Sequence, residues 1–320
     1  MNEQATPLPL TLRDRLRQGR FVMTAELVPP VSCDAQDLLR KAAELNGFAD
    51  AVNVTDGAGA RAHMSALAAA GIVIGAGLEP ILQITCRDKN RIALQSEMMG
   101  AAALGVRNLL LLTGDDPKAG DQPDTKPVFD IDSKTLIETA RRLRDDGTLP
   151  TGRKVGGHAD FFLGAADTPI DPPTGWQPTG LLGKVKSGAQ FAQTQFCMDA
   201  GIVRRYVGVL EQAGVIRELA LLIGVNPLRS ANSALWMKSH LYGTIIPDAM
   251  IKRMEDAADP AHEGVRICAE LIEELSTIPG VAGVHIMAPG NDAAIPEVIA
   301  AARTRVKEPD SAAKPRCWMT

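Results

Sequence analysis

The sequence lacks any pair of cysteines at a spacing typical of a zinc site or a disulfide framework. Its five cysteines lie far apart without a CxxC motif, which favours a reducing, cytoplasmic location. Its five histidines form no HxxH or HExxH motif, so no metal site is predicted. The cysteines are Cys33, Cys86, Cys197, Cys268 and Cys317, and the histidines are His63, His158, His240, His262 and His285.

The chain also lacks an excess of charge of one sign and a long apolar run. Its 34 basic and 38 acidic residues nearly balance, which argues against nucleic acid or an acidic membrane surface as a partner. No segment approaches the roughly 20 apolar residues of a membrane span, and no apolar stretch precedes the first charges. These absences predict a soluble, unexported protein of the cytoplasm.

The sequence does contain a regular alternation of short apolar runs and longer segments with helical spacing. The runs end in Gly, Asp, Asn or Pro and read as strands. Eight such units predict a single-domain α/β fold, a closed (β/α)8 barrel of the TIM type. A doubly wound open sheet is the alternative, but no GxGxxG turn follows the first strand. The predicted strands span 21–27, 50–55, 79–85, 106–113, 159–166, 189–196, 218–224 and 282–288.

The barrel is predicted to occupy residues 21–306, between an N-terminal extension (1–20) and a C-terminal tail (307–320). Two stretches rich in Pro, Gly and Asp, 114–130 and 167–180, follow strand ends. They are expected to form loops over the active-site face, although tolerated insertions would look the same. Helices are predicted at 35–45, 59–71, 87–105, 133–147, 181–188, 199–214, 247–257, 263–276 and 291–306.

One carboxylate, Glu26, lies near the end of the apolar run FVMTAELVPP, which Pro29 and Pro30 terminate. A charge in a buried strand is unfavourable unless the group is paired or protonated, so burial would raise the pKa of Glu26. A raised pKa is what a general acid needs near neutral pH. The alternative is a structural ion pair, since such pairs also perturb pKa values.

Polar residues at the carboxyl ends of barrel strands converge on one site. Asp115, in TGDDP, adds a second carboxylate there, so one group can act as an acid and the other as an ionised electrostatic partner. Gln193 and Gln195 alternate onto one face of a strand, and buried amides need hydrogen-bond partners such as a polar heterocycle. Thr and Gly at strand ends more often serve turns and caps. The other polar or turn residues at predicted strand ends are Thr55, Asp56, Gln83, Thr85, Thr113, Gly114 and Asn226.

These segments resemble the methylenetetrahydrofolate reductase family over nearly the whole chain. The resemblance rests on AELVPP, VNVTDGAGARAHMS, LQITCRDKNRIALQSEMMGAAALGVRN, LLLLTGDDP, FFLGAA and GKVKSGAQFAQTQFCMD, in this order at successive strand ends. It implies a (β/α)8 barrel that carries FAD. It also implies that NADH or NADPH reduces the flavin, which then passes a hydride to 5,10-methylenetetrahydrofolate and gives 5-methyltetrahydrofolate.

The resemblance also implies roles for individual residues. Glu26 would be the general acid that assists protonation of N10, Asp115 would lie between flavin and pterin, and Gln195 would contact folate. Gln83 departs from the His of many members, and Asp167 interrupts a Val-Asn-Pro ending. Contacts with FAD are implied for Thr55, Gln83, Thr113, Gly114, Asp115 and Lys184.

These departures leave two alternatives, a folate-binding accessory subunit of a methyltransferase system and a flavin-independent reductase. A barrel enzyme for an unrelated small molecule is a third, because a fold alone does not define a function. Ala231 takes the place of an aromatic that stacks on the ligand in some members, and Trp176 or Trp236 would substitute for it. Trp318, in the tail, is a candidate contact in a homo-oligomer.

Overall fold

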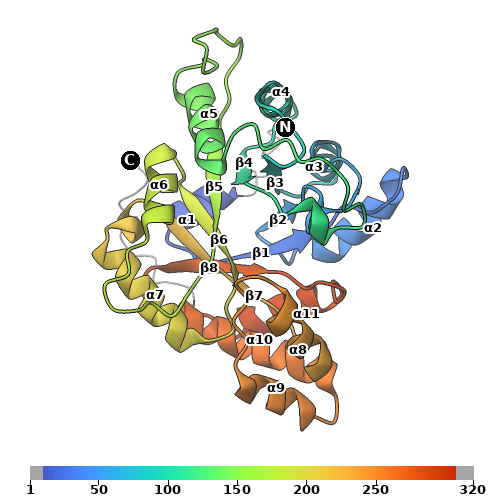
Figure 1. Cartoon of the computed structure of the whole chain (residues 1–320). Helices are drawn as coiled ribbons and strands as arrows, with labels where there is room; N and C mark the ends of the chain where they lie inside the picture. Colours follow the sequence, from blue (N-terminus) through green and yellow to red (C-terminus); the bar gives the residue numbers. More distant parts are fainter. Residues whose placement is uncertain (1–9, 308–320) are drawn as a thin grey trace, which may run out of the picture.

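Eight parallel β-strands close into a barrel in the computed structural model, which describes residues 10–307 (Figure 1). Each strand pairs with the next along the chain, and β8 pairs with β1. This confirms the predicted single-domain (β/α)8 barrel, and each strand begins within three residues of its predicted start. The strands are β1 (Val22–Leu27), β2 (Ala51–Val54), β3 (Pro80–Thr85), β4 (Asn108–Leu112), β5 (Phe162–Asp167), β6 (Phe191–Phe196), β7 (Ala220–Val225) and β8 (Val281–Ile286).

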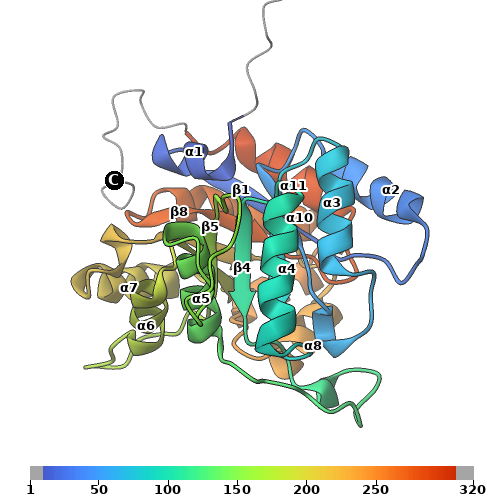
Figure 2. The same ribbon diagram turned by 90° about the horizontal axis from the view of Figure 1, so that it is seen from above.

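Helices surround the barrel, as Figure 2 shows for α4 beside β4. Each predicted helix overlaps an observed one, although α3 begins seven residues after its predicted start, and α1 and α8 are additional. No helix within residues 10–307 is long and apolar enough to cross a membrane. The helices are α1 (Leu12–Arg17), α2 (Ala35–Leu45), α3 (Ala66–Gly75), α4 (Arg91–Ala103), α5 (Ser133–Asp145), α6 (Thr179–Ser187), α7 (Ala200–Gln212), α8 (Ala231–His240), α9 (Asp248–Glu255), α10 (Pro260–Ser276) and α11 (Ala294–Arg303), with short 3-10 turns η1 (Ala58–Ala60), η2 (Pro117–Ala119) and η3 (Val215–Arg217).

Helix α1 closes the N-terminal end of the barrel, although it lies within the segment expected as an extension. Leu12 and Leu16 are buried in an apolar cluster with the first inward-facing residues of the strands. In that cluster the rings of Phe162 and Phe191 stack with centroids 4.9 Å apart. Figure 2 shows α1 at this end of the barrel and the long loop after β4 at the opposite end. The predicted tail, with Trp318, lies outside the described residues apart from Lys307.

A layer of polar side chains lies inside the barrel, between the apolar cluster under α1 and the carboxyl ends of the strands. Its four members are Thr24, Asn53, Gln193 and His285. Gln193 Nε2 donates to Thr24 Oγ1 and Asn53 Oδ1, both at 3.0 Å, and Asn53 Nδ2 donates to Gln193 Oε1 at 2.6 Å. His285 Nδ1 lies 3.0 Å from Thr24 Oγ1. Burial lowers the pKa of His285 to about 3, so its imidazole is neutral. Protein groups therefore satisfy Gln193 without a ligand.

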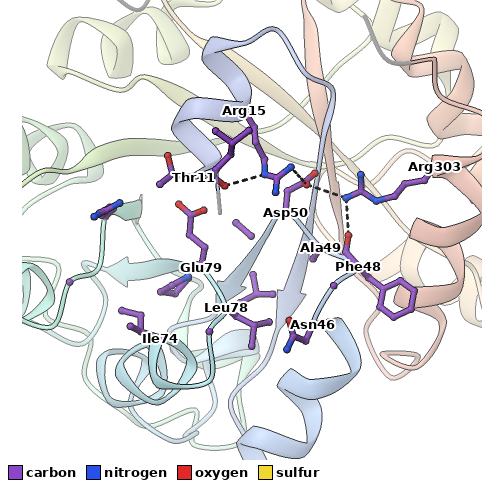
Figure 3. Close-up of a pocket in the computed structure, with 18 residues that line it drawn as sticks. Thr11, Arg15, Asn46, Phe48, Ala49, Asp50, Ile74, Leu78, Glu79 and Arg303 are labelled. Carbon is purple, nitrogen blue, oxygen red and sulfur yellow. Dashed lines mark hydrogen bonds and ion pairs between the residues drawn. The ribbon is translucent and has the colours of Figure 1, made fainter. Parts of the chain in front are cut away.

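A cavity of about 720 Å³ opens at the N-terminal end of the barrel (Figure 3). Its polar side chains mainly bind one another or the backbone. Asp50 contacts Arg15 at 3.3 Å and Arg303 at 3.1 Å, and Glu79 accepts a 2.8 Å hydrogen bond from the Leu12 N–H. The side chains that line the cavity therefore connect α1 and α11 to the barrel. The cavity lies away from the predicted site.

Replacing Asp50 by alanine is expected to lower the free energy of unfolding by about 3 kcal/mol. The carboxylate is only 5% exposed, and its loss leaves Arg15, Arg303 and the Met23 N–H without their shared acceptor. Urea denaturation measures the change. Asp248→Ala, which removes an exposed ion pair, is the control and should cost less than about 1 kcal/mol. An equally small loss for both variants would contradict the role of Asp50.

Candidate functional site

Glu26 lies at the carboxyl end of β1, where the two-residue alternation that places Val22 and Thr24 inside the barrel also turns Glu26 inward. The side chain is largely enclosed by protein. Burial is the main cause that raises the pKa of Glu26 to about 7, and the negative charges of Asp292 and Asp115 raise it further. A carboxyl of this kind holds a proton that it can release near neutral pH, as a general acid must.

Glu26→Gln is expected to stabilise the fold more at pH 8 than at pH 5. The pKa of Glu26 is raised from 4.5 to about 7 in the folded protein, so its ionisation costs stability as the pH rises through this range. The variant should therefore gain about 2 kcal/mol more over the wild type at pH 8 than at pH 5, measured by urea denaturation. Glu44→Gln, at an exposed position, is the control. A gain that does not depend on pH would contradict the raised pKa.

Asp115 follows β4 after a turn that only glycine accommodates well. Gly114 has a φ of +96°, and a Cβ there would lie 2.9 Å from Arg87 Cβ and 3.2 Å from Thr85 Cβ. This close packing fixes the backbone position of Asp115, whose side chain is exposed. Its charge raises the pKa of both Glu26 and Arg87, so the two predicted catalytic carboxylates interact electrostatically.

A third carboxylate, Asp292, completes this cluster and was missed from the sequence. It follows β8, and its Oδ2 lies 3.4 Å from Lys41 Nζ of α2. Its charge is the largest electrostatic contribution to the raised pKa of Glu26 after burial itself. The available signal was its position in APGND, directly after the eighth predicted strand.

Two predicted flavin contacts have hydrogen-bonding groups without a partner among residues 10–307. Thr55 is 2% exposed, and no group accepts from or donates to its Oγ1. Gln83, half-buried on β3, makes no side-chain hydrogen bond within this part of the chain. Buried polar groups normally have partners, so the unpaired hydroxyl of Thr55 suits the donor or acceptor edge of a heterocycle such as a flavin, and the amide of the half-buried Gln83 is free to bind the same edge. Thr113, a third predicted contact, is exposed just beyond β4.

Gln195, the predicted folate contact, does not share the partners of Gln193. The pairing register of β6 and β7 shifts between Gln193 and Phe196, so Gln195 lies at an irregularity in the pairing of these two strands. Gln195 Nε2 donates to the Tyr242 carbonyl at 3.2 Å, and its Oε1 accepts from the Phe196 N–H at 3.0 Å. The loop between α8 and α9 thus holds this amide near the carboxyl end of β6.

Lys184, predicted to meet a cofactor phosphate, bonds to the end of β5. Its Nζ donates to the Ala166 carbonyl at 2.5 Å. Burial lowers the pKa of Lys184, and the charge of Asp167 opposes this shift. Asp167 accepts a hydrogen bond from Tyr206, while burial raises the pKa of Asp167. A phosphate ligand would therefore compete with these protein groups for Lys184.

The two tryptophans considered as ligand-stacking aromatics both have aromatic neighbours. The Trp176 ring lies 5.8 Å from that of Tyr206. Trp236 of α8 is 54% exposed and stacks on His240 at 5.0 Å. Trp236 is therefore the more accessible of the two.

The closed barrel and the carboxylate cluster define the class of this protein. The charges of Asp115, after β4, and Asp292, after β8, raise the pKa of Glu26 at the end of β1, and its pKa of about 7 lets this carboxyl exchange a proton near neutral pH. The profile of the methylenetetrahydrofolate reductase family matches residues 11–303. The chain belongs to this family.

Similar proteins with assigned names are distant in sequence. Methylenetetrahydrofolate reductase 2 of Schizosaccharomyces pombe is 23% identical over 190 residues, which cover 58% of this chain and 28% of that protein. A probable methylenetetrahydrofolate reductase (NADPH) of Caenorhabditis elegans is 22% identical over 235 residues, covering 70% and 32% respectively. The chain thus matches about a third of the length of these relatives.

Solved structures share the fold. An uncharacterized protein from Clostridium thermocellum that binds two copies of 5-methyl-5,6,7,8-tetrahydrofolic acid has a TM-score of 0.64 at 12% identity, covering 92% of this chain and 98% of that one. The coenzyme F420 dependent tetrahydromethanopterin reductase of Methanopyrus kandleri has a TM-score of 0.57 at 13% identity, covering 90% and 100%. At these identities the likeness concerns the barrel alone.

Proposed function

We propose that this protein reduces 5,10-methylenetetrahydrofolate to 5-methyltetrahydrofolate, with FAD as cofactor and NADH or NADPH as reductant. The observation that carries the proposal is the enclosed Glu26 carboxyl, with a pKa of about 7, beside the charge of Asp115 in a chain of this family. Thr55 and Gln83 support a bound heterocycle, because their free hydrogen-bonding groups face no protein partner among the described residues.

In the proposed mechanism Glu26 provides the proton and Asp115 the negative charge. Proton delivery to N10, directly or through water, breaks the bond between N10 and the methylene carbon and leaves a cationic iminium at N5. The carboxylate of Asp115 stabilises this cation. FAD, when bound and reduced by NADH or NADPH, supplies the hydride that the methylene carbon accepts. The product has therefore gained one proton and one hydride.

The remaining predicted residues serve binding in this proposal. Gln195 orients the folate with its amide, which already lies near the carboxyl end of β6. Proposed contacts with FAD come from Thr55, Gln83, Thr113, Gly114, Asp115 and Lys184.

Two alternatives each have an observation in their favour. The hydrogen bond from Lys184 to the Ala166 carbonyl leaves this cation less available to a cofactor phosphate, which favours a reductase that works without flavin. The Clostridium thermocellum protein of the same fold binds methyltetrahydrofolate, which is compatible with an accessory subunit that only holds folate.

Anaerobic stopped-flow spectroscopy on protein supplied with FAD distinguishes these functions. Bleaching of the flavin band by NADH or NADPH, followed by its recovery on adding methylenetetrahydrofolate, would support the flavin reductase. Oxidation of NADH or NADPH by methylenetetrahydrofolate without FAD would support the flavin-independent route. Folate binding with neither reaction would support the accessory subunit.

A further inference from the structure

Arg87 is a buried cation at the meeting point of three loops. It follows β3 and is 3% exposed, although arginine is almost never buried without partners. Its Nε and Nη2 donate to both carboxylate oxygens of Asp88, at 2.7 to 3.0 Å, and its Nη1 donates to the Gly57 carbonyl at 3.2 Å. Its own carbonyl accepts a 2.7 Å hydrogen bond from the Val128 N–H, near the end of the long loop after β4.

Glycines in the turns after β2 and β4 pack closely against Arg87. A Cβ on Gly57 would lie 2.3 Å from Arg87 Nη2, and a Cβ on Gly114 would lie 2.9 Å from Arg87 Cβ. Both glycines also have positive φ, +62° and +96°. Arg87 therefore fills the space between the turn that follows Thr55 and the turn that precedes Asp115.

The charges around Arg87 connect it to the acid. Hydrogen bonds from Arg87 to Asp88 are the main cause of its raised pKa, and the charges of Asp115 and Asp56 add to it. Asp115 in turn raises the pKa of Glu26. Asp115 thus interacts electrostatically with both the Arg87 cation and the protonatable carboxyl of Glu26.

Other charged groups near this chain of interactions have their own partners. Asp56 accepts from the Thr85 N–H at 2.9 Å and from Lys89 Nζ at 2.8 Å. Lys89 also pairs with Glu97 at 2.7 Å. On the other side of Glu26, Asp292 lies 3.4 Å from Lys41. Arg87 packs against the Gly114 turn and interacts with the charge of Asp115.

We infer that Arg87 is a positioning residue, which locks the turns after β2 and β4 together and offsets part of the negative charge that Asp115 presents to Glu26. The electrostatic part concerns the protein alone, and its consequence for catalysis rests on the proposed function. No bond to substrate is required of Arg87.

The test compares the titration of Glu26 in Arg87→Met and Arg87→Lys. For each protein, the unfolding free energy is measured with and without Glu26→Gln between pH 5 and 9. The difference between the two values, plotted against pH, gives the titration of Glu26. Arg87→Met should raise the midpoint of Glu26 by about half a pH unit, about threefold in proton affinity, because Asp115 is no longer offset. Arg87→Lys keeps the charge and should leave the midpoint within about 0.2 units.

Two further variants keep the inference testable if Arg87→Met does not fold. Asp88→Asn removes the exposed counter-ion of Arg87 and should lower the midpoint of Glu26. When Asp115→Asn is also present, Arg87→Met and Asp88→Asn should each lose most of their effect on the midpoint of Glu26. An unchanged midpoint in Asp88→Asn, or in a folded Arg87→Met protein, would overturn the inference.

Kinetics then separate this inference from the proposed function. If the protein reduces methylenetetrahydrofolate, the pH at which this reaction is lost should move with the midpoint of Glu26 in each variant. If the midpoints move and no variant or wild-type protein reduces folate, the inference on Arg87 stands and the proposed function fails.

Discussion

Glu26→Gln should reduce the rate of folate reduction by about 1,000-fold while leaving reduction of FAD by NADH or NADPH within about twofold of the wild type. Glutamine keeps the size of the side chain and its hydrogen-bonding capacity, but it cannot deliver a proton to N10. Only the folate half-reaction needs that proton. Stopped-flow measurement of the two half-reactions in the same preparation tests both expectations.

The control for this variant is Glu79→Gln at the opposite end of the barrel. Glu79 is also a carboxyl whose pKa burial raises, and its partners are Leu12 and Asn108. Its substitution should leave both half-reactions within about twofold, since a proton so far from the site serves no step. If Glu26→Gln slows both half-reactions equally, Glu26 has a structural role and the proposed acid is wrong.

Asp115→Asn should slow folate reduction by about 100-fold, because the amide no longer stabilises the iminium cation electrostatically. The same substitution removes a negative charge near Glu26 and should therefore lower the pKa of Glu26. The alkaline limb of the pH profile for folate reduction should shift to lower pH as a result. Flavin reduction should be affected less than folate reduction.

Asp116→Asn is the matched control for this second variant. Asp116 is the next residue along the same loop, and its side chain caps η2 by accepting from the Lys118 N–H. Its replacement should leave both the rate and the pH profile close to wild type. A normal folate half-reaction in Asp115→Asn would remove Asp115 from the mechanism.

The barrel could be predicted from the sequence because each strand is a short apolar run with a clear end. VMTAEL and NLLLL are buried almost throughout and are followed by Pro or Gly turns. Helix α1 was not predicted because its six residues are too short to show helical periodicity. Helix α8 buries only Ala234 and Met237, so it has no apolar stripe to recognise.

The candidate site was predictable where one strand end carries the signal. Glu26 stands out as the acid in an apolar run, and Asp115 stands out between Gly114 and a downstream proline. Asp292 and Arg87 interact with Glu26 and Asp115, which are distant from them in the sequence. The spacing of residues within one segment therefore does not reveal these interactions. The different hydrogen-bond partners of Gln193 and Gln195 depend on residues of other strands and loops, which the sequence of one strand does not display.

The polar layer inside the barrel has a consequence for how the molecule assembles. Thr24 and Asn53 come from the first half of the chain, whereas Gln193 and His285 come from the second half. Neither half alone can pair these groups, and their contacts span 140 to 261 residues. A half-barrel that closed on a copy of itself would lose the hydrogen bonds that join Asn53 and Thr24 to Gln193. The layer therefore favours joining of the two complementary halves over symmetric misassembly.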